Sequence, residues 1–105
     1  MKSSFKRPFK NFVKKANKPL QLAIHDEVDY VCDHPYEGEA KIGDLQGFYV
    51  RKFSFNRQLY LIAYRPPAVE QDAEVVEIEF LMIDFYKVGV HENFYDELKH
   101  YLKEE

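Results

Sequence analysis

The sequence contains no tryptophan, only one cysteine and no long apolar run. The single Cys32 excludes a disulfide within the chain, and it cannot form a zinc site without histidine ligands. None of the four histidines stands at metal-ligand spacing from it: His25, His34, His91 and His100. No stretch approaches the roughly 20 apolar residues that span a bilayer, and no apolar segment follows the basic N-terminus as in a signal peptide. We therefore expect a cytoplasmic protein without a metal or other cofactor.

Aromatic residues other than tryptophan are abundant, with nine Phe and eight Tyr among 105 residues. The hydrophobic share of 46% and charged share of 31% are typical of a soluble globular protein. A chain of this length fits one domain with one modest core, so residues 1–105 are interpreted as a single domain. The core is expected to be aromatic, with some Tyr hydroxyls at the surface or against a partner.

Charge is segregated along the chain, although the net charge is only -3. Residues 1–20 and 45–65 contain Lys and Arg but no Asp or Glu, while residues 21–44 and 66–105 are mainly acidic. This segregation can create a positive patch on a net acidic protein. It is equally compatible with basic and acidic segments that simply pair with one another.

Two helices are predicted in the N-terminal third of the chain. Apolar residues at helical spacing indicate a first helix over Phe5–Ala16, and Pro8 fits its first turn. A second helix is expected to begin near Pro19 and to end before Pro35, because the residue before a proline is pushed out of the helical region. Together they read as an antiparallel helical hairpin.

Three strands and a terminal helix are predicted to follow. Phe48–Phe55 and Leu59–Tyr64 are rich in strand-forming residues and flank a short turn, so they predict a β-hairpin. Val75–Phe85 is predicted as a third, longer strand with Gly89 marking its end, and a short C-terminal helix follows from Phe94. Helices followed by grouped strands indicate an α+β fold, with two N-terminal helices packed on one face of a small twisted antiparallel sheet. The residues expected to be largely buried are Phe9, Phe12, Leu20, Ile24, Val28, Ile62 and Ile78.

Three stretches resemble the RelE/ParE toxin superfamily. They are the helical hairpin ending at Pro35, the run from Gly43 through the basic strand to Tyr64, and the tail Gly89-Val90-His91-Glu92-Asn93-Phe94-Tyr95. The last is similar to a G-x-H-E-N-F-Y tail of one branch. Many members begin with a strand, which only Met1–Ser4 can supply here. The resemblance implies the toxin of a type II toxin–antitoxin pair, with a cognate antitoxin as its partner.

The resemblance leaves two activities open. The RelE branch cleaves mRNA in the ribosome without a metal, whereas the ParE branch inhibits DNA gyrase and is not a nuclease. Cleavage by 2′-OH attack needs proton transfer and cations that stabilise the phosphorane. By resemblance, Lys52, His91 and Tyr95 are the expected catalytic residues. Each also has an ordinary structural interpretation as a strand lysine, a residue at a helix start or a half-buried helix tyrosine.

Further cations are candidates for RNA binding. Arg51, Arg57 and Arg65 can contact the RNA backbone, although strand alternation places Arg51 on the opposite face from Lys52. Leu61 and Ser54 stand where RelE-like nucleases carry basic residues. The expected partners are therefore mRNA and the ribosome, with DNA gyrase as the alternative target. Basic residues of the first helix also predict an antitoxin segment that is acidic and apolar on one face.

Overall fold

The computed structural model describes residues 2–67 and 81–105. Within these ranges, five strands form one sheet in the order β1-β5-β4-β3-β2. The strands are β1 (Lys2–Phe5), β2 (Glu39–Ala40), β3 (Tyr49–Phe55), β4 (Gln58–Arg65) and β5 (Met82–Val90). The helices are α1 (Arg7–Lys15), α2 (Lys18–Asp33) and α4 (Phe94–Glu104), with a short 3-10 turn η1 (Gly43–Leu45). No helix in the described ranges has the length and apolar character needed to cross a membrane.

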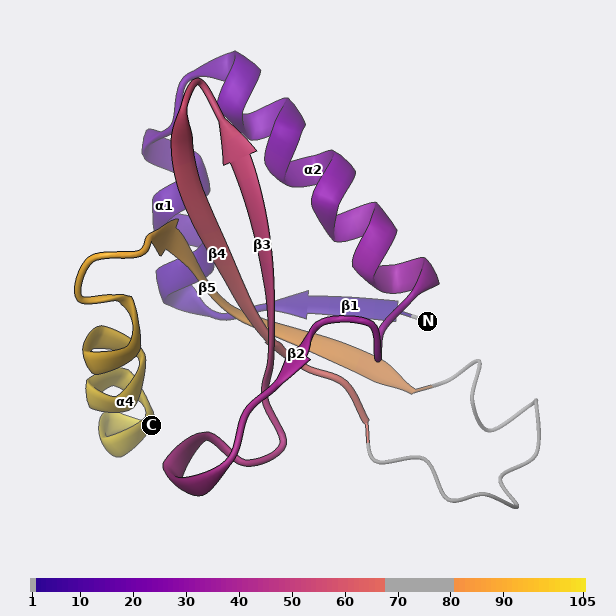
Figure 1. Ribbon diagram of the computed structural model, residues 1–105, viewed down its shortest axis with the longest axis vertical. Coiled ribbons are helices and arrows are strands. Elements are labelled where there is room, and N and C mark those ends of the chain that lie inside the picture. The colour runs from indigo at the N-terminus through magenta and orange to yellow at the C-terminus, as the bar shows by residue number, and fades with distance from the viewer. Residues whose placement is uncertain (1, 68–80) are drawn as a thin grey trace.

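The sheet is mainly antiparallel and strongly twisted. Strands β3 and β4 form a hairpin through Asn56 and Arg57, whose φ angles of 50° and 65° match the left-handed turns that suit a twisted hairpin. In Figure 1, β3 and β4 run upright whereas β1 lies almost horizontally. One pair of strands departs from the predicted antiparallel arrangement, because β1 pairs with β5 in parallel, with Lys2 beside Met82. Parallel strands need a long crossover connection, and here the helical hairpin and strands β2, β3 and β4 all lie between β1 and β5 in the chain.

The helical hairpin forms as predicted from its breakers. Pro stands in the first turn of both α1 and α2, where a missing N–H costs nothing. Asn17 caps α2, since its side-chain oxygen accepts a hydrogen bond of 3.0 Å from the Leu20 N–H. The predicted first helix begins two residues too early, because Phe5 completes strand β1.

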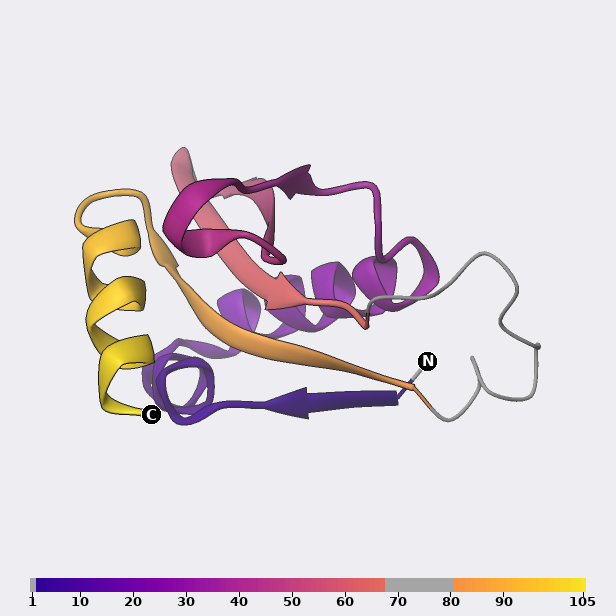
Figure 2. The ribbon, with the colours of Figure 1, turned by 90° about the horizontal axis from the view of Figure 1, so that it is seen from below.

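Two apolar clusters cover the two faces of the sheet. The face covered by α1 and α2, here the α1/α2 face, buries Phe9, Leu20, Ile24, Val28, Val31, Phe53, Ile62, Tyr64, Ile83, Phe85 and Val88. The other face, here the α4 face, buries Leu45, Phe48, Val50, Leu61, Ala63, Tyr86, Phe94 and Leu98. Figures 1 and 2 show α2 and α4 on either side of the sheet. The predicted α+β fold, with a helical hairpin on one face, is confirmed.

Some expectations need correction in detail. Phe12 is only half-buried, because it packs at the sheet margin against Tyr60, with ring centroids 6.2 Å apart. The third strand was expected over Val75–Phe85, but β5 extends to Val90 because β4 pairs with it up to that residue. Residues 75–80, including Ile78, lie outside the described residues.

Candidate functional site

Lys52 lies on the α4 face of the central hairpin. It stands opposite Leu61 in the β3–β4 pairing, and Leu61 is fully buried under α4. The Lys52 side chain is half exposed, and its Nζ lies 3.6 Å from Oε2 of Glu39. This lysine is therefore accessible but already has a carboxylate neighbour.

The short strand β2 supplies the groups beside Lys52. Glu39 pairs with Val50, so its side chain projects onto the face to which Val50 and Lys52 both point. Two residues later, Lys41 returns to the same face, and its Nζ lies 3.2 Å from Oε1 of Glu39. One carboxylate thus contacts two ammonium groups, one through each oxygen.

Lys41 connects this pair to α4. Its Nζ lies 4.8 Å from the centroid of the Tyr95 ring, within the range of a cation–π contact. Tyr95 sits in the first turn of α4, and the ring of His91, which precedes the helix, lies edge-on to it at 6.2 Å. Asn93 adopts a left-handed conformation, with φ of 61°, between these two residues.

The contacts form one continuous set of side chains, here the Lys41–Tyr95 cluster: Lys52, Glu39, Lys41, Tyr95 and His91. It joins strand β3, the edge strand β2 and the residue that follows β2 to the start of the last helix. The three residues expected to be catalytic therefore lie on the α4 face in one chain of contacts, although Lys52 is linked to Tyr95 only through Glu39 and Lys41.

The charged groups of the cluster favour one another's ionised forms, as the pKa shifts of Glu39 and Lys41 show. A hydrogen bond and the positive charge of Lys41, together with the charge of Lys52, lower the pKa of Glu39. Partial burial lowers the pKa of Lys41, but the hydrogen bonds and charges of Tyr95 and Glu39 outweigh it, so the net pKa is raised. The cluster thus places one carboxylate between two lysines, with a tyrosine and a histidine beside them.

Arg51 does not belong to this cluster. It points to the α1/α2 face, where its Nε donates a hydrogen bond to Glu27 at 2.5 Å. Its guanidinium carbon also lies 4.0 Å from the Tyr30 ring centroid. Arg51 therefore links β3 to α2, and these contacts stabilise the packing of the helix on the sheet.

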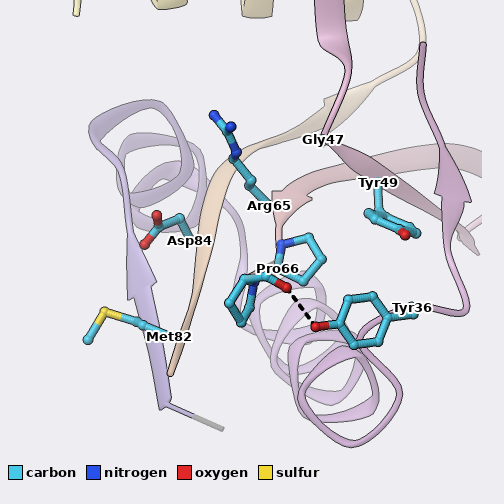
Figure 3. Close-up of a pocket in the computed structure, with 8 residues that line it drawn as sticks. Tyr36, Gly47, Tyr49, Arg65, Pro66, Met82 and Asp84 are labelled. Atoms are coloured by element: carbon cyan, nitrogen blue, oxygen red, sulfur yellow. Dashed lines mark hydrogen bonds between the residues drawn. The ribbon is translucent and has the colours of Figure 1, made fainter. Parts of the chain in front are cut away.

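Arg57 and Arg65 lie at opposite ends of β4. Arg57 is exposed in the hairpin turn. Arg65 lies 5.6 Å from the ring of Phe48 and lines a separate pocket beyond the end of the strand. Figure 3 shows this pocket, in which Tyr36 donates a 2.7 Å hydrogen bond to the Pro67 carbonyl. Neither arginine contacts the Lys41–Tyr95 cluster through an interaction recorded within the described residues.

Two residues of the cluster were missed in the sequence. Glu39 and Lys41 stand in a short polar stretch between glycines, which reads as a loop. Their spacing of two residues was the available signal, because it puts both on one side of an extended segment. Leu61, which replaces a cation of RelE-like nucleases, forms part of the core beneath α4 instead.

Comparison with known proteins identifies a family. A family model described as the ParE-like toxin of type II bacterial toxin–antitoxin systems matches residues 4–99. No curated protein and no solved structure gives a significant match.

Proposed function

The chain belongs to the ParE-like toxins of type II bacterial toxin–antitoxin systems, and we propose that it acts in the cytoplasm by cleaving ribosome-associated mRNA. As a toxin of this type, it has a cognate antitoxin as its partner. The observation that carries the proposed activity is the Lys41–Tyr95 cluster, which gathers anion-binding and proton-transferring groups on one face. Residues 1–105 act as a single toxin domain in this proposal.

The proposed reaction is an attack of a ribose 2′-oxygen on the adjacent phosphorus. His91 accepts the 2′-OH proton in its neutral form, since imidazole exchanges protons near neutral pH. The new bond between the 2′-oxygen and phosphorus forms as the bond to the 5′-oxygen breaks. Tyr95 supplies the proton to the leaving 5′-oxygen, and Lys41 and Lys52 stabilise the charge of the phosphorane. The products are a 2′,3′-cyclic phosphate and a 5′-hydroxyl, with no metal in the reaction.

Exposed arginines outside the cluster are proposed to bind the RNA backbone away from the bond that is cleaved. Arg65 ends β4 and Arg57 lies in the turn before it, and in this proposal both contact the phosphate backbone of the RNA. Arg51, which the sequence also predicts to bind RNA, contacts Glu27 and Tyr30 on the opposite face, so in this proposal it does not contact RNA beside the cluster.

Inhibition of DNA gyrase is the second candidate. Two observations favour it, namely the ParE-like description of the matching family and the carboxylate of Glu39, which offsets one of the two lysine charges. An inhibitor needs a binding surface and no proton transfer. The two activities therefore differ in their dependence on His91 and the Tyr95 hydroxyl.

We expect His91→Ala and Tyr95→Phe to relieve growth inhibition and to reduce cleavage of translated mRNA by about 10²-fold or more, the usual effect of losing an acid or base. Primer extension on a translated transcript measures the cleavage. Matched controls are His100→Ala, an exposed histidine paired with Glu104 on the same helix, and Tyr101→Phe, a half-buried tyrosine outside the cluster. Circular dichroism checks that all four variants are folded.

A different set of results would support inhibition of DNA gyrase. Purified wild-type protein that blocks DNA supercoiling and leaves translated mRNA intact would establish gyrase inhibition. In that case His91→Ala and Tyr95→Phe should keep most of their toxicity.

A further inference from the structure

Glu39 is an exposed carboxylate that lies in the site proposed to bind RNA phosphate. Its two oxygens contact different lysines, Oε1 at 3.2 Å from Lys41 Nζ and Oε2 at 3.6 Å from Lys52 Nζ. Lys52 lies on β3 and Lys41 follows directly after β2, and both converge on this one group. Glu39 is itself about half exposed, with 54% of its side-chain surface accessible, so no burial forces it there.

A phosphodiester resembles this carboxylate in the features that lysines recognise. Each carries one negative charge spread over two oxygens, and each accepts charge-assisted hydrogen bonds from ammonium groups. With Glu39 in place, the two lysines and the carboxylate carry a net charge of about one positive unit. Without it, the same space carries two positive charges and no anion.

We propose that Glu39 is a resident anion, which fills the phosphate site between Lys41 and Lys52 and must be displaced when RNA binds. This inference rests on the proposed function, since it concerns the same site. In this role Glu39 lowers the affinity of the site for RNA, because it competes with the phosphate for the two lysines. It is not a catalytic residue. Because β2 has only two residues and lies at the sheet edge, Glu39 can move aside without disturbing the core.

Proton transfer by Glu39 is the competing interpretation, and its electrostatics disfavour it. An efficient general base has a pKa close to the working pH. The hydrogen bond from Lys41 and the charges of both lysines instead lower the pKa of Glu39. A carboxylate in this state binds cations well and accepts protons poorly.

The test compares Glu39→Gln with Glu37→Gln. Glu37 is an exposed acid two residues away that contacts Tyr30 and His34 but neither lysine. Glu37→Gln therefore removes the same charge outside the site. The probe is a short single strand of fully 2′-O-methylated RNA, which cannot be cleaved by 2′-OH attack. We expect Glu39→Gln to bind it roughly three- to tenfold more tightly than wild type, since two exposed ion pairs no longer compete. Glu37→Gln should change the affinity less than twofold.

A second measurement uses a translated transcript at saturating concentration, which is the substrate of the proposed function. The resident-anion role predicts a cleavage rate for Glu39→Gln within a few-fold of wild type, whereas a general base would lose about 10²-fold or more. Equal affinities of wild type and Glu39→Gln for the methylated RNA, including no binding by either, would overturn the proposal, and so would loss of cleavage in this variant alone. If wild type does not cleave the translated transcript, the nuclease function fails while the affinity comparison still decides the role of Glu39.

Discussion

At the residue scale, Gly38 lies so close to Tyr64 that a side chain at this glycine has no room. The Tyr64 hydroxyl is fully buried and has no hydrogen-bond partner at normal distance among the described residues. A Cβ atom on Gly38 would lie 2.5 Å from that hydroxyl and 3.1 Å from the Val50 carbonyl oxygen. The glycine is therefore required because the tyrosine ring fills the space beside the start of β2.

We expect Gly38→Ala to lower the free energy of unfolding by about 1–3 kcal/mol, as overpacking usually does. Tyr64→Phe should be nearly neutral, because the buried hydroxyl that it removes makes no hydrogen bond of normal geometry within the described part of the chain. In the double variant Gly38→Ala/Tyr64→Phe, the missing oxygen should restore about 1 kcal/mol of the loss. Urea denaturation followed by circular dichroism measures all three. A double variant as unstable as Gly38→Ala would show that the Val50 carbonyl, not the hydroxyl, is the obstacle.

Individual site residues were predictable where one strand or one helix start determined their place. Alternation along Tyr49–Phe55 separates Lys52 from Arg51, and the tail spacing puts His91 beside Tyr95. Lys41 could not be assigned, because its position depends on the pairing of a two-residue strand with β3. Such pairing follows from long-range contacts that a local pattern does not contain.

At the element scale, the helical hairpin leaves an apolar groove between α1 and α2. Its walls include Phe5, Phe9, Val13, Leu22, Ile24 and Val28. Its rim carries Lys10, Lys14 and Lys18, with His25 beside them, and Leu22 is 55% exposed. An apolar floor with a basic rim suits an acidic amphipathic helix, which we propose is a segment of the antitoxin.

The triple change Lys10→Glu/Lys14→Glu/Lys18→Glu should slow association with the antitoxin at low salt by about tenfold or more and remove most of its salt dependence, because rim charges steer encounter. Lys15→Glu is the control, since Lys15 lies outside the groove, in a hollow with Pro8 and Phe12. Stopped-flow association at several salt concentrations measures the effect. Unchanged on-rates for the triple variant would place the antitoxin elsewhere.

Whole elements were more predictable than their ends. Both helices of the hairpin were recognisable because Pro8, Asn17 and Pro19 mark their starts. Strand β1 was only a family expectation, since four residues before a helix carry no periodic signal of their own. It becomes a strand because β5 offers it a free edge for parallel pairing.

At the scale of the whole molecule, β4 joins the two apolar clusters. Leu61 and Ala63 face α4, while Ile62 and Tyr64 face the helical hairpin, and all four are fully buried. A strand buried on both sides makes each cluster depend on the other. The cluster under α4 also holds in place the helix that carries Tyr95, so stability and the candidate site are linked.

We therefore expect one cooperative unfolding transition. A truncation of a buried side chain on either face should lower the midpoint of this single transition. Phe94→Ala on the α4 face and Phe9→Ala on the α1/α2 face should each cost about 3–5 kcal/mol, close to the total stability of a domain of this size. Far-ultraviolet circular dichroism and tyrosine fluorescence should report the same midpoint in each variant, and Lys103→Ala, an exposed change on α4, should leave it unshifted. If Phe94→Ala instead released α4 in a separate early step, with the remaining transition unchanged, the clusters would be independent. The Lys41–Tyr95 cluster could then be lost without unfolding the sheet, because its tyrosine would leave with the helix.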